Sequence, residues 1–364
     1  MTALDLTGLR RFPDVEADNL FAVDASDRLI LDEAAHSLPG ARVVVLGDHY
    51  GALTIGGARL GARDIRVFQD SLIGELALAN NADNAVVYRS LPLAPELLEG
   101  ATVVLLQLPR GLAELDEWAG LIAAHADSGV EVYAGGRIKH ISVAMNEVLL
   151  RHFGRLDVSL ARQKSRVLAA REPQSSVAEY PVKQFNSELD LWVCAHGAAF
   201  AGAKLDIGTR FLLSVLGDAV PDADTIIDLG CGTGILAASL ARSRPGAAVI
   251  ATDVSWAAVA SARATMDANG LDVAVVRDVG LSTQPDASVD LVVLNPPFHV
   301  GATVHTGLAD RLFADAARVL RAGGELWTVY NSHLGYRPAL RRIVGDTREV
   351  ARNAKFTVTA SRRS

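Results

Sequence analysis

Short apolar runs alternate with longer stretches of helical periodicity along the whole chain. The apolar runs cover residues 43–46, 65–68, 101–106 and 130–134 in the first half, and 225–229, 248–252, 273–276, 290–294, 325–330 and 356–359 in the second. Such runs are typical of strands buried on both faces, as in parallel sheets. Helical stretches lie at 113–124, 211–216, 236–241 and 308–320, and the last is expected to stop at Gly323-Gly324. The alternation predicts an α/β fold with doubly wound parallel sheets.

The same landmarks occur in the same order in both halves of the chain. Val43–Gly51 matches Ile226–Gly234, Gln107–Arg110 matches Asn295–Phe298, Arg137–His140 matches Tyr330–His333, and Lys164–Val167 matches Lys355–Val358. An internal duplication explains this order, although any two Rossmann-like domains would share part of it. We therefore expect two tandem Rossmann-like domains, in residues 1–170 and 187–364, joined by a linker at 171–186.

The composition indicates a globular protein of two ordinary domains. The chain has 364 residues, of which 50% are hydrophobic, and its cysteines, Cys194 and Cys231, show neither a disulfide framework nor zinc-site spacing. The N-terminus lacks a basic region followed by an apolar core, and no apolar run approaches the about 20 residues that span a bilayer. We expect a cytoplasmic monomer with no metal site and no membrane contact.

Charge is unevenly distributed along the chain. The net charge of −7 argues against a general affinity for nucleic acid. The acidic excess lies in residues 1–180, however, and residues 311–364 are rich in arginine. A basic C-terminal region on an acidic protein is either a phosphate-binding face or an ordinary solvated surface.

The stretch 226–235 combines a strand, a glycine-rich turn and the start of a helix. Glycines let the backbone approach a ligand closely, and a helix N-terminus offers free N–H groups. A dinucleotide-binding G-x-G-x-x-G motif would need a glycine where this chain has Ile235. Instead, the pattern D-x-G-x-G-x-G resembles the first motif of S-adenosylmethionine-dependent methyltransferases; it consists of Asp228, Gly230, Gly232 and Gly234.

Four polar residues end neighbouring strands of the second half: Asp228, Asp253, Asp278 and Asn295. Because ligands of open α/β sheets bind at the carboxyl ends of the strands, we expect these side chains to converge. Asp253 would accept the ribose hydroxyls of S-adenosylmethionine, and Asp278 would accept from its adenine amine. Asp228 would order the loop or receive the ligand's ammonium. Any one of these acids could instead be a helix N-cap.

The segment 295–298, Asn-Pro-Pro-Phe, suits a planar amine as the methyl acceptor. The side-chain oxygen of Asn295 and the carbonyl of Pro296 would accept its two N–H bonds and direct the nitrogen lone pair toward the methyl group. The prolines stiffen the loop, and Phe298 would stack on a flipped-out base. We expect Asn295, Pro296 and Phe298 to act in catalysis; the alternative is a structural turn with a core phenylalanine.

From about His196 onward, the chain resembles the ribosomal RNA guanine-N2 methyltransferases of the small and large subunits. The resemblance rests on Leu205–Phe211, Asp228–Gly232, Asn295–His299 and Gly323–Leu326, and at Asn331, His333-Leu334 and Asn353–Phe356 it is closer to the large-subunit member. It implies methyl transfer from S-adenosylmethionine to a guanine N2 in ribosomal RNA, free or in a subunit. The expected cofactor-binding residues are Asp206, Arg210, Asp228, Gly230, Cys231, Gly232, Gly234, Asp253, Val254, Asp278, Val279 and Asn295.

Other functions use the same motifs. Glutamine-N5 methyltransferases of release factors and ribosomal proteins, and adenine-N6 methyltransferases, also carry Asn-Pro-Pro-aromatic and act on a planar nitrogen. A third alternative is a non-enzymatic RNA-binding module that keeps an inert Rossmann fold. The intact motif in the second half argues against that module.

The first half lacks the motif's chemistry. His49 replaces the middle glycine of the turn, and the acid of the first strand is absent. We therefore expect a degenerate domain without cofactor, as the resemblance also implies. Such a domain would either hold substrate RNA or only stabilise its partner. The basic residues expected to hold RNA are Arg137, Lys139, Arg162, Lys164, Arg166 and Arg171.

Overall fold

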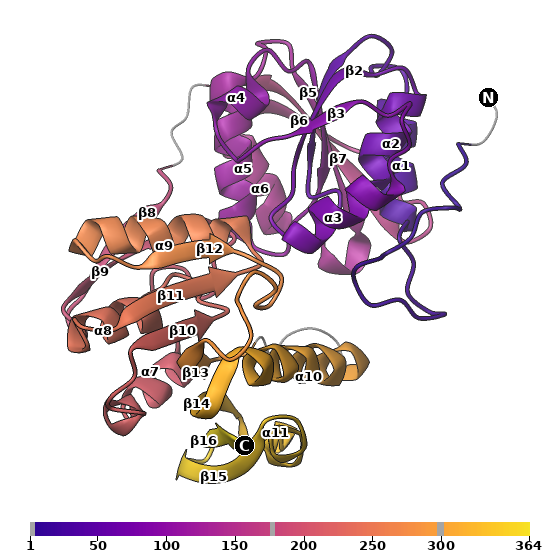
Figure 1. Ribbon diagram of the computed structural model, residues 1–364. Helices are drawn as coiled ribbons and strands as arrows, with labels where there is room; N and C mark the ends of the chain where they lie inside the picture. Colours follow the sequence, from indigo (N-terminus) through magenta and orange to yellow (C-terminus); the bar gives the residue numbers. More distant parts are fainter. Residues whose placement is uncertain (1–3, 175–178, 297–301) are drawn as a thin grey trace. The chain divides into compact units, whose positions relative to one another are not determined.

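Two seven-stranded sheets with the same strand order organise the protein, as a computed structural model shows (Figure 1). The structure describes residues 4–174, 179–296 and 302–364. The chain divides into two compact units, 1–180 and 181–364. Strand β7 reaches Pro173, so its end lies inside the segment 171–186, and strand β8 (Val182–Asn186) lies wholly inside it.

The N-terminal unit is a sheet covered by helices on both faces. Its strands are β1 (Arg42–Leu46), β2 (Arg63–Phe68), β3 (Tyr88–Ser90), β4 (Val103–Gln107), β5 (Glu131–Arg137), β6 (Phe153–Val158) and β7 (Ser165–Pro173). Its helices are α1 (Ala25–Ala34), α2 (Ala52–Arg59), α3 (Leu72–Asn81), α4 (Pro95–Leu98), α5 (Leu112–His125) and α6 (Val143–His152), with a 3-10 turn η1 (Ile138–His140). Figure 1 shows α1, α2 and α3 on one face and α4, α5 and α6 on the other.

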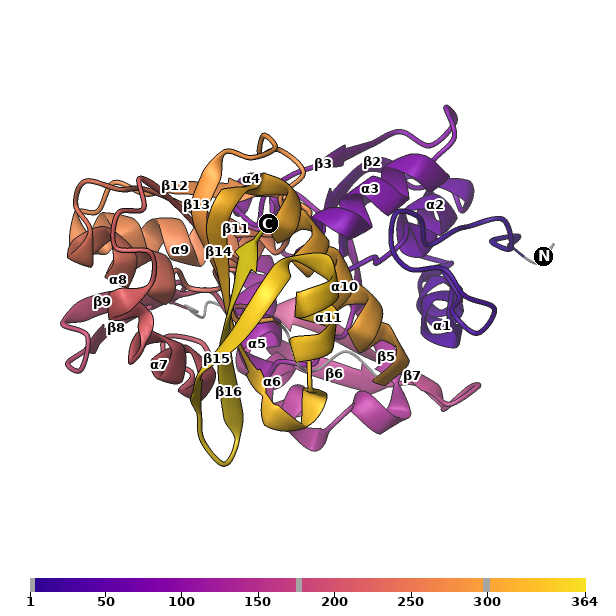
Figure 2. The same ribbon diagram turned by 60° about the horizontal axis from the view of Figure 1, so that its bottom comes forward.

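The C-terminal unit repeats this arrangement. Its sheet contains β10 (Thr225–Leu229), β11 (Ala248–Asp253), β12 (Ala274–Arg277), β13 (Val289–Leu294), β14 (Leu320–Asn331), β15 (Gly345–Arg352) and β16 (Phe356–Arg363). Its helices are α7 (Ile207–Leu213), α8 (Ile235–Ser243), α9 (Trp256–Asn269), α10 (Ala302–Val319) and α11 (Arg337–Ile343), with 3-10 turns η2 (Leu216–Asp218) and η3 (Ser332–Leu334). Figure 2 shows α10 and α11 on one face and α7, α8 and α9 on the other. A hairpin of β8 (Val182–Asn186) and β9 (Leu191–Ala195) precedes the sheet, and β9 packs on α9.

The two sheets share their topology strand by strand. The orders are β3-β2-β1-β4-β5-β7-β6 and β12-β11-β10-β13-β14-β16-β15, with β7 and β16 antiparallel to their neighbours. This confirms the predicted fold of two tandem Rossmann-like domains and is consistent with duplication. The predicted match around Arg137 is one residue out of register. Ile138 N–H bonds the Lys164 carbonyl, as Ser332 N–H bonds that of Lys355, so Arg137 corresponds to Asn331.

Two helix ends differ from the sequence predictions. Helix α10 ends at Val319, and Gly323-Gly324 lies within β14 rather than after the helix. Helix α7 begins at Ile207, where Asp206 caps it, and not at Phe211. The α7 error arises because the hydrophobic period was read without its cap, although an aspartate before a helical stretch is a strong start signal. The α10 error arises because the glycine pair, which lies inside a strand, was taken as a helix stop.

The side-chain alternation of β10 decides where its acid points. Ile227 and Leu229 belong to the core cluster beneath α10 and α11, whereas Ile226 belongs to the cluster beneath α8 and α9. Since successive side chains of a strand point to opposite faces, Asp228 lies on the Ile226 face, under α8. This places a carboxylate in an otherwise apolar layer, at the end of the strand that leads into the glycine-rich turn.

Candidate functional site

The turn after β10 consists of glycines in the left-handed conformation. Gly230, Gly232 and Gly234 have φ of 72°, 54° and 77°, a region that disfavours residues with a Cβ. The N–H groups of Gly230 and Cys231 donate to the Thr252 carbonyl of β11, at 2.8 and 2.9 Å. The turn is therefore fixed to the neighbouring strand while its outer side stays accessible.

The space beside this turn fits a cofactor that packs on the backbone. A Cβ at Gly230 or Gly232 would meet no atom within 4 Å, whereas one at Gly234 would lie 2.8 Å from the Met266 methyl group. The first two glycines therefore border open space, and the third permits close packing of α8 on α9. The residues present thus match the role expected for them in holding S-adenosylmethionine.

Asp253, at the end of β11, links the glycine turn to the next helix. Its Oδ2 accepts from Gly232 N–H at 3.0 Å, and its Oδ1 accepts from Ser255 N–H at 3.0 Å. A carboxylate has acceptor sites on both oxygens, the kind of group that contact with ribose hydroxyls requires, and this contact stays a prediction. The partial exposure of Asp253 agrees with such a role. Trp256, three residues after Asp253, packs its ring against that of His196, with the ring centroids 5.0 Å apart.

Asp228 is fully buried and holds the first turn of α8. Its Oδ2 accepts from Ala237 N–H at 3.0 Å, while its Oδ1 is buried without a hydrogen-bond partner among the described residues. Burial raises the pKa of Asp228 to about 7, although the Ala237 bond opposes this. Of the two predicted roles, the contacts favour ordering of the loop. Burial also raises the pKa of the adjacent Cys231 thiol, which makes it a packing group.

Asn295, directly after β13, is held by two side chains of α7. Its Nδ2 donates to Asp206 Oδ2 at 3.1 Å and to Thr209 Oγ1 at 3.0 Å. Because an ionised carboxylate only accepts hydrogen bonds, the amide must turn its NH₂ group toward Asp206. Its Oδ1 is buried and has no partner among the described residues. The site therefore presents one oriented, unused acceptor.

Gly208 allows this approach of α7 to β13. A Cβ there would lie 3.0 Å from Asp206 Oδ2 and 3.4 Å from Asn295 Nδ2. Asp206 Oδ2 also accepts from the N–H groups of Gly208 and Thr209, at 2.8 and 3.1 Å. Asp206, expected as a cofactor contact, thus caps α7 and positions Asn295. Thr209 was not predicted as a site residue, although it lies in the same helical turn as Asp206.

The remaining predicted residues lie around the same sheet edge with different surroundings. Asp278 is 2% exposed, and its carboxylate accepts from Ser282 and from Thr283 N–H and Oγ1. Arg210 is exposed and paired with Glu188 at 3.0 Å. Val254 and Val279 follow the two strand-end acids and are partly buried. Pro296 is buried beside Asn295, and Phe298 lies outside the described residues. The cofactor contacts of these residues stay predictions.

The N-terminal unit keeps the shape of the turn but fills its open side. Gly47, His49 and Gly51 have φ of 72°, 49° and 99°, so the backbone follows that of Gly230, Gly232 and Gly234. The His49 side chain therefore occupies the position that is open beside Gly232. Gln69 stands at the place of Asp253 and donates to the Gly74 carbonyl at 3.1 Å.

The strand-end amide of the N-terminal unit is also present, but both of its groups are used. Gln107 corresponds to Asn295 in strand register. Its NH₂ donates to Asp27, and its Oε1 accepts from Ser26 Oγ at 3.2 Å. Asp24 caps α1 as Asp206 caps α7. The duplication thus includes this helix, which the sequence comparison missed although Asp24–Asp27 precedes a helix as Asp206–Thr209 does.

Two kinds of site find no support among the described residues. No group of three or more metal-ligating side chains occurs in residues 4–174, 179–296 and 302–364. No helix within those ranges is long and apolar enough to cross a membrane.

Similarity to known proteins extends over both units. The Methyltransferase small domain family matches residues 190–360, and the RLMG N-terminal domain family matches residues 2–174. Ribosomal RNA large subunit methyltransferase G of Streptomyces avermitilis is 38% identical over 96% of this chain and 95% of its own. The protein of the same name from Pseudomonas aeruginosa is 37% identical over 96% of both chains.

A solved structure has the same two-domain fold. It is the T. thermophilus 16S rRNA N2 methyltransferase RsmC, determined in complex with AdoMet and guanosine. It matches with a TM-score of 0.77 and 22% identity over 94% of this chain and 92% of that chain.

We predict that Gly232→Ala lowers affinity for S-adenosylmethionine at least tenfold, because the methyl group enters the open side of the turn. Alanine in the left-handed conformation of this position also costs about 1–2 kcal/mol of stability. Gly270→Ala is the matched control, since Gly270 has φ of 62°, no atom within 4 Å of its Cβ position, and lies at the C-terminal end of α9. Calorimetry on the parent chain should give one site per chain. Equal cofactor affinity of the two variants would contradict the assignment.

We predict that Asp228→Asn reduces the loss of stability as pH rises from about 4 to 7. The folded protein keeps a proton on Asp228 up to about pH 7, whereas the unfolded chain releases it near the ordinary aspartate pKa of 3.8. The folded state therefore binds more protons in this interval, and this group lowers the free energy of unfolding by about 1.4 kcal/mol per pH unit. Urea unfolding at several pH values gives the free energy of unfolding of the parent and of the variant. The difference between the two should grow as the pH rises from about 4 to 7, and a difference that stays constant would refute the role of the buried acid.

Proposed function

Because the chain belongs to the family of ribosomal RNA large subunit methyltransferase G, we propose that it methylates the exocyclic N2 amine of a guanine in ribosomal RNA. The protein is an S-adenosylmethionine-dependent methyltransferase. The resemblance to ribosomal RNA methyltransferases, closer to the large-subunit member, is therefore confirmed. The relatives' names give large-subunit ribosomal RNA as their substrate, and the name of RsmC gives N2 as its position, which supports the proposal.

The observation that carries the proposal is the unused acceptor of Asn295. A buried oxygen without a donor costs roughly 1–3 kcal/mol, so its retention calls for a partner that arrives with the substrate. An exocyclic amine supplies such an N–H donor. The Pro296 carbonyl, next in the chain, is the second acceptor in this proposal, and Phe298 is the stacking face.

The geometry of Asn295 explains how a weak nucleophile could react. The lone pair of a guanine amine is delocalised into the ring, and acceptance of its N–H bonds fixes the direction of that lone pair. S-adenosylmethionine supplies an electrophilic methyl group. The new N–C bond forms as the S–C bond breaks, and the nitrogen then releases a proton to solvent. Asp206 and Thr209 act through Asn295 and are positioning residues.

Family membership favours ribosomal RNA over the glutamine and adenine alternatives. Both alternatives share the planar nitrogen, so Asn295 alone does not separate them. The matched N-terminal domain distinguishes this chain, since the RLMG N-terminal domain covers residues 2–174.

We expect labelled S-adenosylmethionine to transfer its methyl group to ribosomal RNA or a ribosomal subunit, and not to DNA or release factors. Nucleoside analysis of the product should give N2-methylguanosine, because Asn295 and Pro296 hold an exocyclic amine. Label in N6-methyladenosine or in glutamine would replace the proposal with one of the two alternatives.

We predict that Asn295→Ala lowers methyl transfer about a hundredfold or more while cofactor affinity changes only several-fold. The reason is that the side chain orients the substrate amine. Asn269→Ala is a matched control in the same unit, because Asn269 also makes side-chain bonds, to Trp192 and Thr265, but lies at the end of α9. Turnover and calorimetric affinity would be measured for both. Normal turnover of the Asn295 variant would remove it from catalysis.

A further inference from the structure

The N-terminal unit contains a cavity of about 650 Å³ at the carboxyl end of its sheet. It lies at the ends of β1, β2, β4 and β5, and His49, Gln69, Gln107 and Arg137 line it. This is the location of ligand sites in open α/β sheets, and the volume is within the range of about 300–1,000 Å³ typical of them. The N-terminal unit therefore contains a hollow of ligand size at this sheet edge, although a glycine of its turn is replaced.

Three basic residues line this cavity, Arg110, Arg137 and His140, and three more lie near them in the chain or across the sheet: Lys139, Lys164 and Arg166. They come from the end of β4, the end of β5, turn η1 and the beginning of β7. Arg137 pairs with Ser165 across β5 and β7, and Gly136 pairs with Arg166. His140 is exposed, and slight desolvation, then the charges of Arg110, Lys139 and Arg137, lowers its pKa, which agrees with their proximity. Like charges are thus gathered at one sheet edge.

None of these six side chains forms an ion pair within residues 4–174, whereas most arginines of the unit do. Arg162 pairs with Asp32, and Arg171 pairs with Glu131 and Asp157 at 2.7 and 2.9 Å. These two were expected to hold RNA, but their charges are already compensated. Arg166 Nε is buried without a hydrogen-bond partner among the described residues. Uncompensated cations with a buried, unused donor indicate an anion as ligand.

The acids that line the cavity do not neutralise this cluster. Asp14 accepts from Arg11 and from the Tyr50 hydroxyl, and Asp24 caps α1. Burial, with the charges of Asp70 and Glu117, raises the pKa of Glu114 to about 8. These groups provide acceptors, or a donor in the case of protonated Glu114. A ligand that carries an anion together with N–H and O–H groups complements both parts of the cavity.

We propose that this cavity binds a single-stranded nucleotide of the substrate RNA, with its phosphate on the Arg110, Arg137, Lys139 cluster and its nucleoside inside. The proposal rests on RNA being the substrate. Two differences argue against S-adenosylmethionine as occupant: His49 adds a Cβ where Gly232 leaves open space, and Gln69 stands at the position of Asp253. The unit's excess of acidic residues confines RNA contact to this local cluster.

The first test is the salt dependence of binding of a single-stranded ribosomal RNA oligonucleotide to the full chain. Arg110 and Lys139 are exposed, so the double variant Arg110→Gln, Lys139→Gln should fold. We expect weaker binding and a log–log salt slope that is shallower by about 0.7, the value for one lost phosphate contact on a single strand. Affinity for S-adenosylmethionine should stay unchanged.

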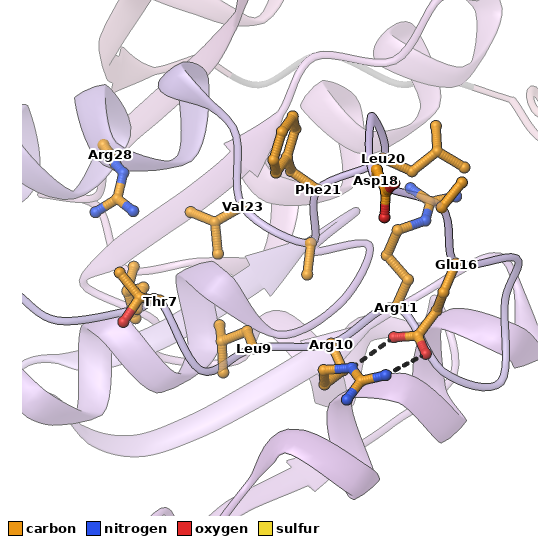
Figure 3. A pocket seen from close by; sticks show the side chains of 13 residues that line it. Thr7, Leu9, Arg10, Arg11, Glu16, Asp18, Leu20, Phe21, Val23 and Arg28 are labelled. Atoms are coloured by element: carbon orange, nitrogen blue, oxygen red, sulfur yellow. Dashed lines mark hydrogen bonds and ion pairs between the residues drawn. The ribbon is translucent and has the colours of Figure 1, made fainter.

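Arg28→Gln with Arg63→Gln is the matched control, with the same change in charge in the same unit. Both arginines are exposed and form no ion pair within the described residues. Arg63 begins β2, so it lies at the amino ends of the strands, away from the cavity at their carboxyl ends. Arg28 lines a separate cavity of about 510 Å³ beneath the N-terminal segment, where Arg10 pairs with Glu16 (Figure 3). The control should bind RNA as the parent does. Equal slopes for the two double variants would overturn the proposal.

A second measurement locates the ligand. Ile141 lines the cavity, and both native cysteines are buried, so Ile141→Cys provides a selectively labelled thiol. We expect the oligonucleotide to protect it from a maleimide, and S-adenosylmethionine to leave it reactive. Protection by guanosine monophosphate or inorganic phosphate at the oligonucleotide's concentration would reassign the cavity to free nucleotides or anions. Because binding is read without methyl transfer, failure of the proposed function remains distinguishable.

Discussion

A carboxylate can accept hydrogen bonds but cannot donate them, and the catalytic edge of this protein depends on that asymmetry. Asp206 fixes the first turn of α7 and at the same time determines which side of the Asn295 amide faces inward. The acceptor on the other side has no donor among the described residues, and in our proposal it meets the substrate amine. Gly208 makes the contact sterically possible, so the orientation of Asn295 depends on Asp206 and Gly208 together. Cofactor turn and amide then meet because both follow adjacent parallel strands, β10 and β13.

The two units solve the same packing problem with acids at different positions. In the C-terminal unit, Asp228 on the strand accepts from Ala237 N–H of α8. In the N-terminal unit the corresponding strand position is Val45, and Asp48 in the turn accepts from Thr54 N–H of α2. Burial raises the pKa of Asp48 to about 6, as it raises that of Asp228. A buried acceptor for the helix amide is therefore needed in both units, and its origin in the chain is interchangeable.

The sequence was sufficient for the sheets, because buried parallel strands leave uninterrupted apolar runs that a short window detects. It also located the glycine turn and Asn295, whose spacing is local. It did not reveal the bonds from Asn295 to Asp206 and Thr209, since these residues are distant in the chain and meet only through packing of α7. The pairing of Arg162 and Arg171 was likewise invisible, because their partners Asp32 and Glu131 come from other elements. Charge counts alone therefore overestimated the free basic surface.

The conserved backbone of the N-terminal turn has an evolutionary consequence. His49 keeps a left-handed conformation that glycine would adopt without strain, as Gly232 does in the other unit. A glycine at this position would remove the side chain from the turn but would supply no acid at Gln69 and would not release Gln107 from Ser26 and Asp27. Each repair alone gives no gain in catalysis. A working site in the N-terminal unit would therefore need several substitutions at once, which leaves this half of the molecule free to be selected for another ligand.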